Sequence, residues 1–365
     1  MTPQPTPSPT PSPHNRFGLD YRDAAAGLGP PPLPIIDAHA HINGAAAARI
    51  YDEVRRLYGI ERTYSMTFLA EADAVQGVLG DAVRFIAMPD FANPDRAHAH
   101  GPGYLDIITQ WAARGAALVK FWVAPRGREL GRDSGDPALL TLENPWRRRQ
   151  IEHAASLGMS IMVHVADPDT WFAVKYKDPA FYGTKAQQYE PLERLMDEYR
   201  GVQWILAHMG GWPENLDFLD GLLERHPNAS LDSSATKWVV RELSKHPVDR
   251  VLAFMRRWNG RVLFGSDIVT TDRHLTPDKS GRIVPMGDLA SSPQEAFDLY
   301  ASRYFALRTL WETGYDAESP IADPDLKMID PQRYNDLSAP RLVGRRLPPD
   351  LLASLYHDAA AAILR

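Results

Sequence analysis

Short apolar runs alternate with amphipathic segments through most of this chain. The runs have the length of β-strands, and several are apolar throughout, as strands buried on both faces of a sheet are. The eight runs cover residues 35–42, 63–68, 84–89, 117–123, 159–165, 202–209, 229–233 and 261–267. Segments with helical periodicity cover residues 45–58, 103–115, 144–157, 190–199, 215–225 and 238–257. Eight strand–helix units in one series predict an α/β fold of the (β/α)8 TIM-barrel type.

The two ends of the chain depart from this repeating pattern. Residues 2–13 read TPQPTPSPTPSP, a proline-rich polar tract without the apolar residues of a core. We therefore predict a disordered tail and linker over residues 1–30 and a single barrel domain over residues 31–365. Segments 292–312 and 348–364 are predicted to be extra C-terminal helices packed outside the barrel.

Composition narrows the classes of function. The net charge of −6 gives no reason to expect a nucleic-acid partner. No apolar run reaches 18 residues, so no membrane span is expected. The first residues lack the basic and apolar regions of a signal peptide, which favours a cytoplasmic location. The chain has no cysteine, so thiolate ligands and disulfides are excluded, and any metal must be held by His, Asp, Glu or a modified Lys.

Six polar residues stand near the ends of five predicted strands, where burial is costly without partners. They are His39 and His41 in the first run, Lys120 in the fourth, His164 in the fifth, His208 in the sixth and Asp267 in the eighth. Side chains at positions i and i+2 of a strand point to the same side, so the two histidines of the first run project together. In a (β/α)8 barrel, chemistry takes place at the carboxyl ends of the strands. We therefore predict that these residues share one or two divalent metal ions.

Isolated histidines have a simpler interpretation. A single histidine in an apolar run is more often a hydrogen-bonded core residue than a metal ligand. A second His-x-His pair, His98 and His100, follows no apolar strand, and we interpret it as part of a solvated loop. The ordered set of six, at the same end of five strands, favours the shared metal site.

Four of these strand ends closely resemble the amidohydrolase superfamily. The resemblance is to its amidohydrolase-related (amidohydrolase 2) group, which includes hydrolases and decarboxylases of the aminocarboxymuconate-semialdehyde type. The matching motifs are DAHAHI at 37–42, MVHV at 162–165, LAHMGG at 206–211, RVLFGSD at 261–267 and the closing stretch LPPDLLASLYHDAAAAIL. The resemblance implies a distorted barrel and a divalent metal, usually zinc. It also implies that the metal ligands are His39, His41, His164 and Asp267.

The resemblance leaves the number of metal ions open. In its two-metal branch, a lysine of the fourth strand is carbamylated and bridges the ions, and Lys120 stands at that position. His208 then either binds a second metal or acts on the substrate and the metal-bound water. An ordinary ammonium group at Lys120 is the alternative, and one ion is favoured over two because many members of the group work with one.

The expected reaction is hydrolysis of an amide, lactone or ester of a small molecule. Asp267 is expected to accept a proton from a water molecule activated by the metal, and His208 to help polarise the substrate carbonyl. The alternative is a metal-dependent, non-oxidative decarboxylase of a small aromatic or unsaturated acid, and a third reading is a non-catalytic binding barrel. Candidate substrate contacts are Trp122, Lys237, Arg241, Arg273 and His274. A small-molecule substrate is the expected binding partner. The resemblance also suggests that the protein forms a homodimer.

Overall fold

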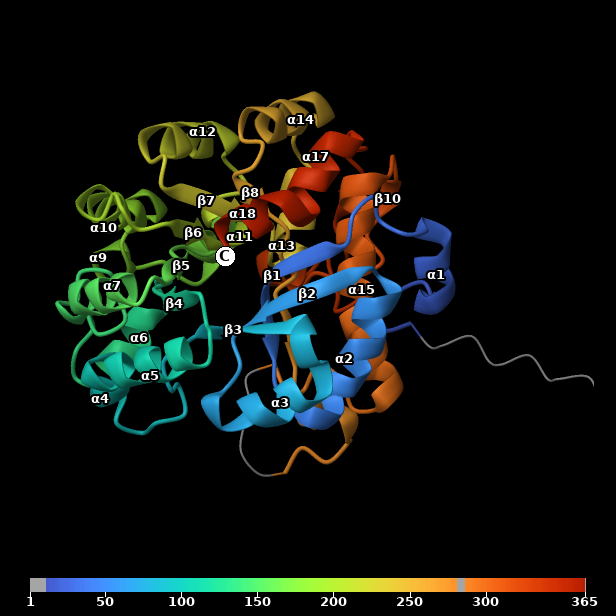
Figure 1. The fold of residues 1–365 in the computed structure, drawn as a ribbon. Helices are drawn as coiled ribbons and strands as arrows, with labels where there is room; N and C mark the ends of the chain where they lie inside the picture. The colour runs from blue at the N-terminus through green and yellow to red at the C-terminus, as the bar shows by residue number, and fades with distance from the viewer. Residues whose placement is uncertain (1–10, 281–285, 365) are drawn as a thin grey trace, which may run out of the picture.

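The computed structural model describes residues 11–280 and 286–364, and within them nine parallel strands form one sheet (Figure 1). The strands are β1 (Ile35–Ile42), β2 (Ile60–Ser65), β3 (Val83–Ala87), β4 (Leu118–Trp122), β5 (Ser160–His164), β6 (Trp204–Leu206), β7 (Ala229–Asp232), β8 (Val262–Leu263) and β9 (Ile268–Thr270). Each of β1 to β8 pairs with its neighbour in the chain, and β9 pairs with β1. The predicted (β/α)8 barrel is therefore confirmed.

The eighth strand of the barrel is broken in two. β8 pairs with β7, whereas β9 pairs with β1. Between them, the Phe264 carbonyl accepts a hydrogen bond of 2.8 Å from the Ala38 amide, and the Asp267 amide donates one of 2.8 Å to the His39 carbonyl. These bonds close the barrel across the break. The prediction of a continuous strand over 261–267 is wrong, because residues 264–267 leave the regular ladder.

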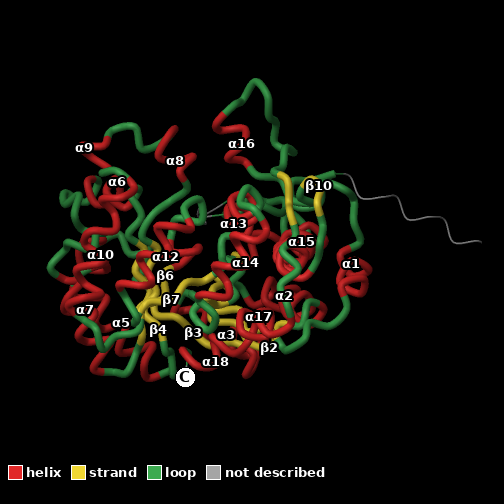
Figure 2. The backbone as a smooth tube through the Cα atoms, turned by 90° about the horizontal axis from the view of Figure 1, so that it is seen from above, coloured by secondary structure: helices red, strands yellow, loops and turns green. Residues whose placement is uncertain are grey.

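Helices cover the outside of the sheet, and several of the shorter ones gather over one end of it (Figure 2). The longer ones are α1 (Tyr21–Leu28), α2 (Ala45–Leu57), α3 (Ala72–Leu79), α5 (Pro102–Ala113), α7 (Trp146–Ser156), α10 (Lys185–Glu198), α12 (Leu216–Arg225), α13 (Thr236–Leu243), α14 (Val248–Arg257) and α15 (Pro293–Glu312). The shorter ones are α4 (Arg96–His100), α6 (Gly127–Arg132), α8 (Asp169–Val174), α9 (Pro179–Tyr182), α11 (Ala207–Gly210), α16 (Pro324–Ile329), α17 (Pro349–Ala353) and α18 (Ala359–Ile363). β10 (Asp316–Glu318) and β11 (Arg341–Val343) form a separate antiparallel pair. None of the described helices has the length and apolarity to cross a bilayer.

The two ends of the barrel differ. α8 follows β5 directly, so the short helices α6, α8, α9 and α16 rise on the side where the strands end (Figure 2). At the opposite end, α18 packs against the apolar side chains inside the barrel, and the Tyr64 hydroxyl donates a 2.8 Å hydrogen bond to the Leu364 carbonyl. The C-terminal helices therefore close one end and leave the other for the site.

The predicted N-terminal tail is too long. α1 packs against α15, where the Tyr21 and Phe305 rings meet edge to face with centroids 5.7 Å apart. His14 and Asn15 are also buried. The buried apolar residues Tyr21 and Ala25, of a kind that the proline-rich tract lacks, hold α1 on the barrel. The prediction of a disordered tail through residue 30 is therefore wrong for these residues, while the first ten lie outside the described ranges.

Two further boundaries differ from the prediction. β2 begins three residues before the predicted strand 63–68 and ends at Ser65. The predicted helix 238–257 is two helices, α13 and α14, because Pro247 precedes α14 and cannot continue the ladder of hydrogen bonds from α13.

Candidate metal centre

The two histidines of β1 meet the aspartate that follows β8. The Nε2 atoms of His39 and His41 lie 3.5 and 3.3 Å from Oδ1 of Asp267. The strand alternation that predicted a common direction for the two imidazoles brings them to one carboxylate. These three residues supply donor atoms that lie within 4.8 Å of one another, which fits a metal ion.

Two site residues that follow strands have a left-handed backbone conformation, which sets the direction of their side chains. Asp267 has φ 59°, and His208 has φ 59° in α11, just beyond β6. Residues other than glycine rarely adopt this region, and they do so where the surroundings fix them. Here the His208 amide donates a 2.9 Å hydrogen bond to Asp232, and the Asp267 amide is held by β1. The unusual backbone is therefore anchored on both sides of the site.

His164 and His208 form a second pair of donors. Nδ1 of His164 lies 3.2 Å from Nε2 of His208. The other nitrogen of His164 lies 3.0 Å from Asp167, which also accepts a 2.5 Å hydrogen bond from the Tyr176 hydroxyl. An ionised carboxylate only accepts hydrogen bonds, so it holds the proton on Nε2 and leaves the lone pair of Nδ1 facing His208.

Lys120 joins this centre from β4. Its Nζ lies 3.2 Å from Nε2 of His39, and its side chain is buried. Burial lowers the pKa of Lys120 to about 8, although the charges of Asp232 and Asp267 oppose the shift. The lowered pKa raises the share of the neutral amine, and the neutral form is the one that reacts with carbon dioxide to give a carbamate.

Asp232 and Ser234 support both histidine pairs, and the sequence analysis did not single them out. Asp232 Oδ2 lies 2.8 Å from Nδ1 of His39. Ser234 donates its hydroxyl proton to Oδ1 of Asp232, and its oxygen lies 2.7 Å from Nδ1 of His208. Both imidazoles therefore carry their proton on Nδ1 and present the lone pair of Nε2 to the centre. The signal was present, because Asp232 stands one residue before the end of the seventh predicted strand.

Asp37 braces the break in the eighth strand rather than joining the donors. It accepts hydrogen bonds from the Ser266 amide at 3.0 Å, the Ser266 hydroxyl at 2.6 Å and the Tyr304 hydroxyl at 2.7 Å. Burial raises the pKa of Asp37 to about 7, against the effect of these bonds. Asp37 therefore holds the backbone around Ser266 in place.

The protonation states at the centre suit a metal. Burial lowers the pKa of His39 and holds that of His208 well below its ordinary value, so both rings are neutral. Burial alone would raise the pKa of Asp267, but the His41 hydrogen bond and the neighbouring imidazoles hold it well below its usual range. Neutral imidazoles and an ionised carboxylate are the forms that bind divalent cations.

A cavity of about 980 Å³ opens above these donors. It reaches His39, His41, Lys120, His164, His208 and Asp267, so it brings the six predicted residues together. Its other walls are mainly apolar and come from Met66, Phe68, Leu69, Met88, Phe91, Ile107, Trp122, Val269 and Met286. Trp122 is thus placed as a candidate substrate contact should be.

The other four candidate substrate contacts are not among the residues that line this cavity. Arg241 is buried in ion pairs with Glu242, Asp323 and Asp325. His274 uses both ring nitrogens, at 2.9 Å from the Tyr300 hydroxyl and 2.8 Å from the Met286 carbonyl.

Arg273 and Lys237 also lie elsewhere. Arg273 pairs with Asp288 at 2.9 Å, and Lys237 lies on α13. The structure does not bring these four residues to the cavity, because a position just after a strand does not fix the direction of a side chain.

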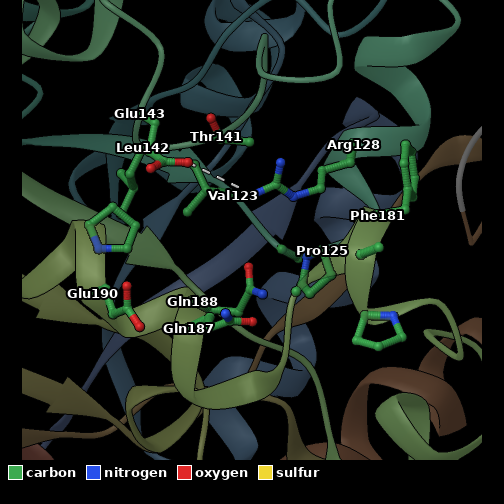
Figure 3. A pocket seen from close by; sticks show the side chains of 15 residues that line it. Val123, Pro125, Arg128, Thr141, Leu142, Glu143, Phe181, Gln187, Gln188 and Glu190 are labelled. Carbon is green, nitrogen blue, oxygen red and sulfur yellow. Dashed lines mark ion pairs between the residues drawn. The ribbon is translucent and has the colours of Figure 1, made fainter.

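A smaller cavity of about 260 Å³ lies between the loop after β4 and the helices α9 and α10 (Figure 3). Arg128 and Glu143 face each other across it at 4.0 Å. Its Gln187 and Gln188 side chains are bonded to backbone of their own helix start. No predicted site residue lines it.

Comparisons with known proteins give matches only among solved structures. No family model matches the chain, and neither does any curated protein. The 5-carboxyvanillate decarboxylase LigW from Sphingomonas paucimobilis is 12% identical, with a TM-score of 0.44, over 91% of this chain and 99% of that one. An amidohydrolase from Burkholderia multivorans with bound zinc is 11% identical, with a TM-score of 0.43, over 90% of this chain and 98% of that one.

A dihydroorotase from Campylobacter jejuni is 10% identical, with a TM-score of 0.40, over 74% of this chain and 81% of that one. The matches thus include amidohydrolases and decarboxylases, the kinds of enzyme that the motifs resemble. With TM-scores below 0.5, they carry no conclusion about chemistry, which rests on the side chains of the site.

Proposed function

We propose that this chain is a metal-dependent hydrolase of a small molecule, with His39, His41 and Asp267 as ligands of one divalent ion. The observation that carries the proposal is the convergence of these three donors at the floor of the large cavity. Imidazole and carboxylate ligands suit zinc. An ion held there would act as a Lewis acid and would lower the pKa of a water molecule that it binds.

His164 and His208 favour a second ion. Their hydrogen bonds to Asp167 and Ser234 leave one lone pair on each ring, and these two nitrogens face each other at 3.2 Å. Two lone pairs at that distance repel each other unless a cation or a shared proton lies between them. Lys120, as a carbamate, would add an oxygen ligand to both positions, as the two-metal branch of the resembling family does.

Two adjacent ions are typical of hydrolytic sites, which supports hydrolysis over decarboxylation. Asp267 is the candidate proton acceptor because it is ionised, partly exposed and faces the cavity. His208 presents an unprotonated Nε2, so it cannot donate a hydrogen bond to a substrate carbonyl from that atom. We therefore assign His208 to metal binding and leave polarisation of the carbonyl to the ions.

The walls of the cavity suggest the substrate class. Met66, Phe68, Met88, Phe91 and Trp122 surround the approach to the donors. Apolar and aromatic walls with a few polar groups at one end suit a small molecule with an apolar or aromatic body and one reactive polar bond. An ester, lactone or amide of this kind fits the volume of about 980 Å³.

A direct test compares two product readouts with protein reconstituted with zinc, manganese or cobalt. A panel of aromatic and aliphatic lactones, esters and amides is followed by proton release, and a panel of aromatic acids by release of carbon dioxide. We expect acid release that falls by at least about a hundredfold in Asp267→Asn. The matched control is Asp90→Asn, an exposed carboxylate at the same cavity, which should keep most of the activity.

Release of carbon dioxide without hydrolysis would show that the site belongs to a decarboxylase. Turnover of neither panel with any metal would support the non-catalytic barrel. Lys120→Met separately tests the second ion, because it should lower the number of bound metal ions per chain from two to one.

A further inference from the structure

Two cations between α13 and α15 lack hydrogen-bond and ion-pair partners within the described part of the chain. They are Lys237 on α13 and Arg303 on α15, two helices that pack against each other (Figure 1). The Arg303 side chain belongs to a residue that is only 9% exposed, and its Nη1 atom is buried without a hydrogen-bond acceptor among these residues. A buried donor left unpaired costs free energy, so such a group usually has a ligand or a water molecule as its partner.

His14 joins these cations from the N-terminal segment. Its Nε2 lies 2.6 Å from the Leu289 carbonyl, and its Nδ1 is buried with no hydrogen-bond partner in the described ranges. Burial and the charges of Arg303 and Lys237 lower the pKa of His14 to about 3. Burial and the Arg303 charge likewise lower the pKa of Lys237 to about 7. The packing of α13 against α15 brings Lys237 and Arg303 to one interface, and the charges of both act on His14. We call these three groups the cationic cluster.

The nearest carboxylates are already bonded to other groups. Asp323 attracts both Lys237 and Arg303, but its hydrogen-bonded partner is Arg241. Asp325 is bonded to Arg241 and also to the Trp171 indole at 3.0 Å. The two carboxylates therefore attract the charges of Lys237 and Arg303 from a distance, but they do not accept hydrogen bonds from the N–H groups of these cations.

The cationic cluster lies beside the metal centre without lining its cavity. Asp267 is among the groups whose charge acts on Arg303. α13 begins directly after Ser234 and Ala235, so its first residues lie on the face of the barrel that carries the site. Neither Lys237 nor Arg303 is among the residues that line the cavity of about 980 Å³.

We propose that the cationic cluster is a binding site for a small oxyanion, with Arg303 and Lys237 as its donors. A guanidinium group binds carboxylate or tetrahedral oxyanions through two parallel N–H groups, and a lysine adds a point charge. The oxyanion is either a carboxylate or a tetrahedral inorganic anion, and both offer oxygen acceptors to these donors. This inference does not depend on the proposed hydrolysis, since it concerns residues outside the donor set.

The test is isothermal titration calorimetry with sodium sulfate as the probe, at ionic strength held constant with sodium chloride. We expect one sulfate per chain, before and after metal removal by a chelator. Lys237→Met and Arg303→Met should each weaken the dissociation constant by at least about tenfold. Lys237→Arg, which keeps the charge, should retain binding, and so should Lys177→Met, which removes an exposed lysine.

Competition by acetate identifies the source of the anion. If acetate displaces sulfate, the cluster binds carboxylates as well, and if it does not, the cluster takes only a tetrahedral inorganic anion. Thermal unfolding gives a second measurement. Sulfate should raise the melting temperature of the wild type but not that of Lys237→Met or Arg303→Met. Absence of sulfate binding, or unchanged binding in Lys237→Met and Arg303→Met, would overturn the proposal.

Discussion

The carboxylate of Asp232 lies 2.8 Å from Nδ1 of His39, and both side chains are fully buried. Because this carboxylate is ionised, it fixes the proton of His39 on Nδ1 and turns Nε2 toward the other donors. The same carboxylate accepts the hydroxyl proton of Ser234, which bonds His208. One buried acid therefore sets the orientation of two imidazoles.

Asp232→Asn should weaken metal affinity by about ten- to a hundredfold, the usual cost of losing such a support. The amide cannot accept from both partners as the carboxylate does, so the His39 ring loses its fixed tautomer. Competition with a chromophoric chelator measures the affinity. Asp232→Asn with the affinity of the wild type would show that the pair is only a packing contact, and Asp90→Asn is the matched control.

Gly265→Ala should lower both stability and metal affinity. A Cβ atom at this position would lie 3.0 Å from Cβ of Ser234 and 3.1 Å from Cβ of His39, closer than ordinary packing allows. Overpacking of this kind costs about 1–3 kcal/mol in the free energy of unfolding, and here it also displaces a ligand. Denaturant unfolding and chelator competition measure the two effects.

Gly27→Ala is the control for that substitution. No heavy atom lies within 4 Å of a Cβ there, and the residue belongs to α1. Alanine in a helix should keep the metal affinity and leave stability equal or higher. If Gly265→Ala behaves in the same way, the close approach at the site is absent in solution.

His98 and His100 lie in α4 and His100 is buried, so the interpretation of this pair as a solvated loop is wrong. His100 should make the protein less stable in mild acid. Burial and the charges of Arg147 and Arg96 lower its pKa from 6.5 to about 4. Between those values the unfolded chain binds a proton that the folded chain does not, so stability falls as pH decreases from about 6.5 toward 4. The full effect is about 3 kcal/mol.

A comparison of variants isolates this contribution. His100→Gln should show a shallower loss of unfolding free energy from pH 7 to pH 4 in urea titrations. His98→Gln, which removes the exposed histidine of the same pair, should follow the wild type. Parallel curves for His100→Gln and the wild type would contradict the assignment.

The sequence predicted the parts of the site that follow a regular period. His39 and His41 lie in β1 as predicted, and strand alternation alone brings them to one side. The positions of His208 and Asp267 near strand ends were also predictable. Their left-handed backbone was not, because it depends on hydrogen bonds from Asp232 and β1, which are distant in the chain.

Contacts made by loops and helices could not be predicted in the same way. Lys237 and Arg241 both follow β7. The Arg241 side chain pairs with Asp323 and Asp325, about 80 positions away in the chain, instead of turning into the cavity. The ordered segment around Tyr21 was missed for a related reason, since its partner α15 begins more than 250 residues later. Tertiary packing decides both.

The most direct test of the metal centre is metal content by elemental analysis of His39→Ala/His41→Ala, measured beside His98→Ala/His100→Ala. Both double variants remove a His-x-His pair, and circular dichroism confirms that each is folded. We predict that the first loses the ion held with Asp267 while the second keeps the metal content of the wild type. Full metal retention in His39→Ala/His41→Ala would contradict the proposed centre.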